Sequence, residues 1–278
     1  MPIRCVYADL DGTLLGHGGS LLRDAEGGFT LMPVRALEAC HRAGVEVVLK
    51  SGRRKAQVAE DARLIGQSSY IYEVGCGLVV DGEETLLLGG DVERAEGETV
   101  FEAIERAGAP ALLLERYAER LEYHDPWHRG REISHLFRGL VDAVEVNRLL
   151  EEAGHDRVRL VDNGAIAPRE TLGGAAVLGA DPHVYHLIPR GASKADAVAR
   201  HMAARGYARE ETIAVGDSRE DIDVAEHVGR FFLVANGLEK DPDIRSAIVR
   251  HPNVQVTEAR NGEGFYEAVV GALMDARR

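Results

Sequence analysis

The feature that most constrains this chain is a pair of acidic residues at the end of a short apolar run. Ile3 to Ala8 has the apolar content of a buried β-strand, and Asp9-Leu10-Asp11-Gly12-Thr13 follows it directly. Side chains two positions apart on a strand share a face, so both carboxylates are expected to project beyond the strand end. Clustered carboxylates repel unless a cation or a shared proton relieves them. The pair predicts a cation site or a polar turn. A calcium loop is excluded because Leu14 and Ser20 replace its glycine and glutamate.

Both ends of the chain alternate between strand and helix patterns. The predicted elements are helices at Pro33 to Ala43, about Arg53 to Leu64, Ser193 to Gly206 and Glu220 to His227, and strands at Val45 to Leu49, Thr212 to Val215 and Phe231 to Val234. This order predicts an α/β fold with a Rossmann-like parallel sheet covered by helices.

The middle of the chain has a different texture. Ala111 to Leu114 and Val158 to Val161 resemble strands, and Val141 to Ala153 resembles a helix. We interpret residues 82–186 as a smaller α/β cap domain inserted into a core made of residues 1–81 and 187–278. One continuous large domain is the alternative, because 278 residues is within reach of a single domain.

Composition excludes several classes of function. The 46 acidic and 33 basic residues give a net charge of −13, so the broad positive surface of a nucleic-acid-binding protein is not expected. No apolar run approaches the ~18 residues of a membrane span, and no signal-peptide pattern is present, so we expect no membrane association. Cys5, Cys40 and Cys76 fit neither a disulfide framework nor a zinc site. They favour a reducing, cytoplasmic location.

Three further polar groups stand at predicted strand ends or helix starts. Ser51 and Gly52 could hold phosphate oxygens or simply cap a helix. Lys194 opposes the helix dipole at its position, which indicates a nearby anion, although an exposed lysine is the alternative. Asp217 and Asp221 follow a predicted strand and are able to reach one site, but acids are also ordinary in a first helical turn.

Taken together, these groups meet the needs of phosphoryl transfer. A carboxylate that attacks a phosphate ester is an anion approaching an anion. Mg²⁺ held by oxygen ligands, together with a lysine, offsets that repulsion. An aspartyl phosphate is a known covalent intermediate, and a second carboxylic acid can protonate the leaving oxygen and then activate water.

The chain resembles the haloacid dehalogenase-like hydrolase superfamily. The resemblance rests on four ordered motifs: Asp9-Leu10-Asp11-Gly12-Thr13-Leu14-Leu15, Ser51-Gly52-Arg53, Gly191-Ala192-Ser193-Lys194, and Gly216-Asp217-Ser218 through Asp221. The long segment between the second and third motifs resembles the α/β cap, similar to type IIB, of the Cof-type branch.

The resemblance implies a role for each matched residue. Asp9 would be the nucleophile and a metal ligand. Asp11 would be the general acid/base and would bind Mg²⁺ through its backbone carbonyl. The remaining implied roles are phosphate binding by Ser51, Gly52, Lys194 and the more loosely matched Asn236, and metal binding by Asp217 and, directly or through water, Asp221.

Some positions depart from the family pattern. Lys50 precedes the second-motif hydroxyl, where a small residue is usual. Tyr72 to Gly77 resembles the Glu-Asn-Gly-Gly stretch of mannosyl-3-phosphoglycerate phosphatases, but Val74 replaces the asparagine. The loop from Gly16 to Thr30 is longer than the usual flap. These differences leave the chemistry unchanged and the substrate open.

Candidate substrate contacts are Arg53 in the core and His128 and Arg131 in the cap. His124 and His128 are also spaced as a zinc pair on a helix would be, although Pro126 between them favours a turn, and a solvated loop is the alternative. We therefore expect a monomeric or homodimeric phosphatase acting on a small phosphorylated metabolite, such as a sugar phosphate or a phosphorylated glycoside. The alternatives are a phosphomutase on the same core and a non-catalytic metabolite-binding protein. The intact motifs argue against the non-catalytic alternative.

Overall fold

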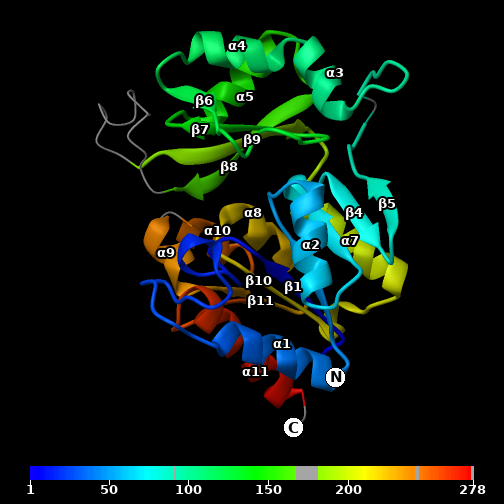
Figure 1. Ribbon diagram of the computed structural model, residues 1–278, viewed down its shortest axis with the longest axis vertical. Helices are drawn as coiled ribbons and strands as arrows, with labels where there is room; N and C mark the ends of the chain where they lie inside the picture. The colour runs from blue at the N-terminus through cyan, green and yellow to red at the C-terminus, as the bar shows by residue number, and fades with distance from the viewer. Residues whose placement is uncertain (91, 167–180, 242–243, 277–278) are drawn as a thin grey trace. The chain divides into compact units, whose positions relative to one another are not determined.

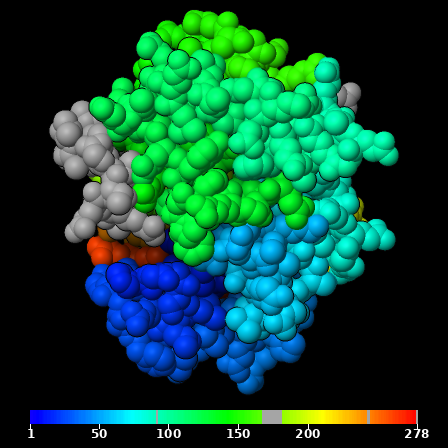
Figure 2. Space-filling view, turned by 45° about the horizontal axis from the view of Figure 1, so that its top comes forward, coloured from blue at the N-terminus to red at the C-terminus, as the bar shows by residue number. Residues whose placement is uncertain are grey.

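The chain forms two compact units. The computed structural model describes residues 1–90, 92–166, 181–241 and 244–276, and the others are drawn in grey in Figures 1 and 2. One unit combines Met1–Thr85 with Ser193–Arg278, and the other is Leu86–Ala192. The narrower insert that we expect from the sequence, residues 82–186, stays a prediction.

The first unit is built on an eight-stranded sheet in the order β12-β11-β10-β1-β2-β3-β4-β5. All pairings from β12 across to β3 are parallel, and β4 runs antiparallel to β3. The predicted α/β fold with a mostly parallel sheet is thereby confirmed. Its strands are β1 (Cys5–Asp9), β2 (Glu46–Lys50), β3 (Tyr70–Tyr72), β4 (Gly77–Val80), β5 (Glu83–Leu86), β10 (Thr212–Gly216), β11 (Arg230–Leu233) and β12 (Val254–Val256).

The strand order reverses at β1. From this strand the chain builds β2 and β3 on one side, and β10, β11 and β12 later fill the other side. Open parallel sheets bind ligands in the crevice at the carboxyl ends of the strands where the order reverses. Asp9 ends β1 and Gly216 ends the neighbouring β10, so both the first and the fourth motif lie at this point.

The helices of this unit begin and end close to the predicted residues. Pro33 lies in the first turn of α1, and Gly44 ends it in the left-handed conformation. The Ser193 side chain caps α7 by accepting a hydrogen bond from the Asp196 amide. In Figure 1, α1 lies beside α11, which it contacts. The helices are α1 (Met32–Ala43), α2 (Lys55–Leu64), α7 (Lys194–Arg205), α8 (Arg219–Ile222), α9 (Ala235–Lys240), α10 (Arg245–Val249) and α11 (Asn261–Asp275), with 3₁₀ turns η1 (His17–Gly19), η2 (Glu73–Gly75), η3 (Arg209–Glu211) and η4 (Asp223–Glu226).

The second unit contains a separate antiparallel sheet in the order β6-β7-β9-β8. The predicted strand at Val158 to Val161 and the predicted helix within Val141 to Ala153 are both confirmed. Its strands are β6 (Leu121–Tyr123), β7 (His135–Gly139), β8 (Val158–Ala165) and β9 (His183–Pro189), and its helices are α3 (Val100–Arg106), α4 (Ala109–Arg116) and α5 (Ala143–Glu152).

The strand predicted at Ala111 to Leu114 is wrong, because these residues lie in α4. A four-residue apolar run does not by itself distinguish a buried strand from one turn of a helix. Pro110 suits the first turn of a helix. Ala109 and Leu113, which lie one turn apart, are the buried positions.

Among the helices that the structure describes, none is both long enough and apolar enough to cross a bilayer.

Candidate active site

Asp9 lies at the carboxyl end of β1 and is almost fully buried. Its Oδ1 is 2.7 Å from the Nζ of Lys194, the first residue of α7. Burial and the neighbouring charge of Asp221 outweigh the effect of the nearby lysines and raise the pKa of Asp9 to about 7. A buried carboxylate in contact with a lysine is held in one orientation, as a nucleophile requires.

Two further carboxylates complete a cluster with Asp9. Ligand oxygens of Asp9, Asp217 and Asp221 all lie within 4.8 Å of one another. Burial also raises the pKa of Asp217, although Lys240, at 3.1 Å, opposes this. The structure therefore brings together three of the four predicted metal-binding residues, and the carboxylate of the fourth, Asp11, is not part of this group.

Two glycines allow the chain to close around Asp217. Gly12 has a φ of +87°, and a Cβ there would lie 2.2 Å from Asp217 Oδ2. A Cβ on Gly237 would lie 2.5 Å from the Asp217 carbonyl oxygen. Any larger side chain at either position would displace Asp217 from the cluster.

Asp221 has both carboxylate oxygens engaged. Its Oδ1 is 2.6 Å from the Nζ of Lys50 and 2.8 Å from that of Lys194. Its Oδ2 accepts hydrogen bonds from the Ser218 hydroxyl at 2.7 Å and from the backbone amides of residues 217 and 218 at 3.3 Å. Burial raises the pKa of Asp221, but the two lysines bring it below its usual range.

Lys194 bridges the cluster. Burial alone would lower its pKa, but the charges of Asp221 and Asp9 raise it well above the usual value for lysine. Its ammonium group therefore stays charged, and two of its three hydrogens are directed at carboxylates.

Asp11 is held in a bidentate ion pair. The guanidinium of Arg53 donates to its two oxygens at 2.8 and 2.6 Å and also contacts Asp61 at 2.9 Å. The Asp11 side chain is about half exposed, unlike that of Asp9. Arg53, predicted as a substrate contact, thus binds the predicted acid/base in this structure. The proton-transfer role predicted for Asp11 would require its side chain to leave Arg53.

Ser51 and Asn236 both contact backbone groups. The Ser51 hydroxyl is buried and accepts a hydrogen bond from the Arg53 amide at 3.1 Å, next to Gly52. Asn236 donates to the Gly12 carbonyl and accepts from the Asn261 amide, each at 2.8 Å. Asn236 therefore joins the first-motif loop to the start of α11.

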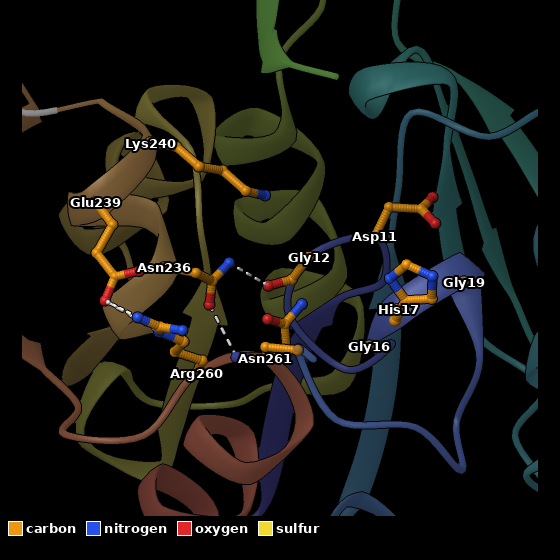
Figure 3. Close-up of a pocket in the computed structure, with 11 residues that line it drawn as sticks. Asp11, Gly12, Gly16, His17, Gly19, Asn236, Glu239, Lys240, Arg260 and Asn261 are labelled. Atoms are coloured by element: carbon orange, nitrogen blue, oxygen red, sulfur yellow. Dashed lines mark hydrogen bonds and ion pairs between the residues drawn. The ribbon is translucent and has the colours of Figure 1, made fainter. Parts of the chain in front are cut away.

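A pocket of about 450 Å³ opens beside Asp11 and Gly12. Figure 3 shows Asn236 between Gly12 and Asn261, and the ion pair of Glu239 with Arg260 on the same wall. Lys240 and His17 also line the pocket, so the Lys240 ammonium group and the acidic Asp11 share its walls.

The structure adds a strained segment that the sequence did not indicate. Glu73, Val74 and Gly75 all have positive φ, at 46°, 60° and 87°. A β-branched residue such as Val74 rarely adopts this conformation, so the fold must enforce it. A Cβ on Gly75 would lie 2.1 Å from the Ser193 carbonyl oxygen. The segment therefore packs directly against the start of α7, whose first residue is Lys194. In the sequence, the departure at Val74 marked this position but did not indicate the strain.

The predicted cap residues lie in the second unit. His128 Nδ1 is 3.1 Å from the Asp125 carboxylate, and its ring stacks on Tyr123. Arg131 is buried and donates to the Trp127 carbonyl at 3.2 Å and to the Ser134 hydroxyl at 2.9 Å. Their proposed role in substrate binding stays a prediction.

The zinc pair considered for His124 and His128 gains no support. Within the part of the chain that the structure describes, the groups of three potential metal ligands are the aspartate cluster and Cys5 with Glu46 and His201. In the second group Glu46 is already engaged by Arg205 at 2.9 Å and by the Tyr207 hydroxyl at 2.8 Å. That group forms part of a polar network joining β2 to α7.

Comparison with known proteins agrees with this geometry. Residues 164–253 match the model of a family described as haloacid dehalogenase-like hydrolase. The chain is 26% identical, over 96% of its length and 95% of the relative's, to a phosphoglycolate phosphatase from Archaeoglobus fulgidus. It is 28% identical, over 82% of each chain, to a phosphoglycolate phosphatase from Halorubrum lacusprofundi.

A similar fold occurs in solved structures. The sucrose-phosphatase from Synechocystis sp. PCC6803, solved with sucrose and phosphate, aligns with a TM-score of 0.65 over 98% of both chains at 14% identity. It has the same combination of a mostly parallel sheet with a separate four-stranded antiparallel sheet, as in type IIB members.

The chain is thus similar to haloacid dehalogenase-like hydrolases, in residues 164–253 of its sequence and in its fold. It is an enzyme, a hydrolase related to phosphatases. Similarity to this family implies a divalent metal ion, and the residues present fit one. Three carboxylates gathered in a buried cluster supply the hard oxygen ligands that such an ion prefers.

Proposed function

We propose that this protein is a magnesium-dependent phosphatase that hydrolyses a small phosphorylated metabolite through an aspartyl phosphate on Asp9. The observation that carries the proposal is the contact of the buried Asp9 with Lys194, beside Asp217 and Asp221 at the point where the strand order reverses. A nucleophile, a fixed cation and further acidic ligands meet at one place there.

In the first step an Asp9 carboxylate oxygen attacks the phosphorus of the substrate. A bond forms between this oxygen and phosphorus, and the bond from phosphorus to the ester oxygen breaks. Lys194 stays charged, so it is able to stabilise the phosphoryl oxygens while it orients Asp9. Ser51 and Gly52, at the end of the adjacent strand β2, are suited to contact the same oxygens.

Asp11 is proposed to give a proton to the departing ester oxygen. In the second step it takes a proton from the water that attacks the phosphoenzyme. The bond from phosphorus to Asp9 then breaks and inorganic phosphate leaves. Because Asp11 is paired with Arg53, binding of the substrate's anionic phosphate would compete for Arg53 and free Asp11.

The residues proposed to hold Mg²⁺ are Asp9, Asp217 and the backbone carbonyl of Asp11. Both oxygens of Asp221 are engaged by protein donors, which favours contact through water over direct ligation. When bound, the ion would offset the repulsion between the Asp9 carboxylate and the phosphate.

A small phosphorylated acid is the favoured substrate class. The curated relatives cited above bear the name phosphoglycolate phosphatase and align over most of both chains. The sucrose-phosphatase shares the fold at 14% identity, which gives weaker support for the sugar phosphates expected from the sequence. We therefore place phosphoglycolate first and sugar phosphates second.

The test is a substrate screen with purified protein and Mg²⁺, scored as released inorganic phosphate and ranked by kcat/KM. We expect turnover of phosphoglycolate without any added bisphosphate, whereas a phosphomutase would require a bisphosphorylated sugar and would release little phosphate. Failure to release phosphate from phosphoglycolate, sugar phosphates and p-nitrophenyl phosphate alike would refute the proposal.

A further inference from the structure

Lysine is scarce in this chain and is concentrated at the aspartate cluster. The sequence contains 29 arginines and only four lysines, namely Lys50, Lys55, Lys194 and Lys240. Three of the four contact Asp9, Asp217 or Asp221. A chain that otherwise uses arginine for positive charge thus uses lysine where a compact ammonium must fit among carboxylates.

Lys50 is the wholly buried lysine of this set that the proposed reaction does not use. It ends β2 directly beside Asp9, with which it pairs in the parallel register. Its side chain is 0% exposed, and its Nζ lies 2.6 Å from Asp221 Oδ1, an oxygen that is also wholly buried. A methionine or leucine would fill the same space without the cost of burying a charge, so packing alone does not account for a lysine here.

The geometry links Lys50 to the nucleophile through Asp221. Asp221 Oδ1 accepts from Lys50 and from Lys194 at once, and Lys194 also contacts Asp9. Two ammonium groups on one oxygen repel each other, so Lys50 pushes Lys194 toward Asp9. With Lys50 absent, Lys194 alone would serve both carboxylates and would shift toward Asp221.

Lys50 also affects the charge that a metal ion meets. When all three are ionised, the carboxylates of Asp9, Asp217 and Asp221 carry −3, and Lys50 and Lys194 together carry +2. Removing Lys50 makes this cluster more negative by one unit and releases one of the donors that occupy Asp221 Oδ1. Both changes would strengthen binding of a divalent cation.

We propose that Lys50 is a positioning residue of the phosphatase reaction. Lys50 holds Asp221 in place, so that Lys194 faces Asp9. In this position Asp221 makes no direct contact with the metal ion. This inference rests on the proposed function. It predicts opposite effects on two quantities, because loss of Lys50 lowers the rate of the chemical step and tightens metal binding. A residue that only supports the fold would not change them in opposite directions.

The deciding variant is Lys50→Met, compared with wild type in two assays. With p-nitrophenyl phosphate we expect kcat to fall roughly 100-fold, as for a misplaced catalytic group, while KM stays within a factor of about two because Lys50 does not reach the substrate. Calorimetric titration with MgCl₂, which needs no turnover, should show binding tighter by more than a factor of about two. The matched control is Lys55→Met. Lys55 pairs with Glu84 away from the cluster, so both quantities should remain as in wild type.

The inference stands only if kcat falls and Mg²⁺ binds more tightly, and any other combination overturns it. Circular dichroism checks the fold. If Lys50→Met does not fold, Lys50→Gln takes its place with the same two expectations, because the amide still donates to Asp221 without a charge. A wild-type protein that releases no phosphate would refute the proposed function instead, and the calorimetric comparison would still test the effect of Lys50 on the metal site.

Discussion

Asp9 keeps its carboxylate in a place where burial makes a negative charge unfavourable. Lys194 and Lys50 favour the charged form, yet the pKa still rises to about 7 because burial and the like charges of Asp221 and Asp217 outweigh them. A nucleophile must be ionised to attack, so the residue relies on a further cation near the cluster. This dependence ties the chemistry of one side chain to the implied metal ion.

The raised pKa of Asp9 predicts a pH-dependent effect of Asp9→Asn on stability without metal. The folded pKa of about 7 exceeds the unfolded value near 4, so ionisation of Asp9 destabilises the fold as pH rises from about 4 to 7. Asparagine stays neutral. At about pH 8 we expect the substitution to increase the free energy of unfolding by ~1–3 kcal/mol relative to wild type. The gain should shrink as pH falls toward 4. Urea unfolding in EDTA measures it, and a difference independent of pH would contradict the prediction.

Several residue identities were predictable and their contacts were not. The acids and Lys194 stood in recognisable motifs at strand ends and a helix start. The ion pairs of Lys50 with Asp221 and of Arg53 with Asp11 join residues 171 and 42 positions apart. No local pattern encodes such distant partners, so these contacts became visible only in the folded chain.

Elements are joined at the site by a few side chains that contact backbone. Asn236 in α9 connects the first-motif loop to the N-terminus of α11 with two hydrogen bonds. The strained segment from Glu73 to Gly75 supports the start of α7. The sequence predicted the elements that carry the four motifs because strands and capped helices have local signatures. It failed at α4, where a short apolar run was compatible with either state.

Asn236→Ala is expected to impair catalysis beyond its effect on stability. Loss of two buried hydrogen bonds should lower the free energy of unfolding by ~1–3 kcal/mol. It should also lower kcat several-fold, since Gly12 is no longer held beside Asp217. The matched control is Asn147→Ala in the second unit, where Asn147 makes the same kind of pair with the Leu160 backbone at 2.9 and 2.7 Å. It should lose similar stability with kcat per folded molecule unchanged. Equal losses of kcat in the two variants would show that Asn236 acts only on the fold.

At the scale of the whole molecule, the site depends on chain segments that lie on either side of an inserted unit. Asp9 and Lys50 come from the segment before Leu86, whereas Lys194, Asp217 and Asp221 come from the segment after Ala192. Folding of the first unit therefore requires both segments, and the metal ion would bind only after they have come together. The parallel sheet that joins them was predicted well by the alternation of strands and helices in the sequence.

Divalent metal should therefore stabilise the folded protein through a specific site. Mg²⁺ at ~100 times its Kd would add about 2.7 kcal/mol and raise Tm. Asp217→Asn should lose most of this increase, and chelation should abolish turnover until Mg²⁺ is restored. A net charge of −13 also attracts Mg²⁺ weakly, so a control for this non-specific effect is required. The control variant is Asp275→Asn, which removes an acid that is paired with Arg230 far along α11. It should keep the full increase in Tm. Equal Tm increases in both variants would argue against the assigned site.

Trapping the covalent intermediate tests directly whether Asp9 is the nucleophile. Protein mixed with substrate and Mg²⁺ is quenched in acid and reduced with borohydride, which converts an aspartyl phosphate to homoserine, and its peptides are then analysed by mass spectrometry. We predict homoserine at position 9 and at no other aspartate, with none in a sample that lacks substrate. Rapid phosphate release with an unmodified Asp9, or with homoserine at another position, would contradict the central claim.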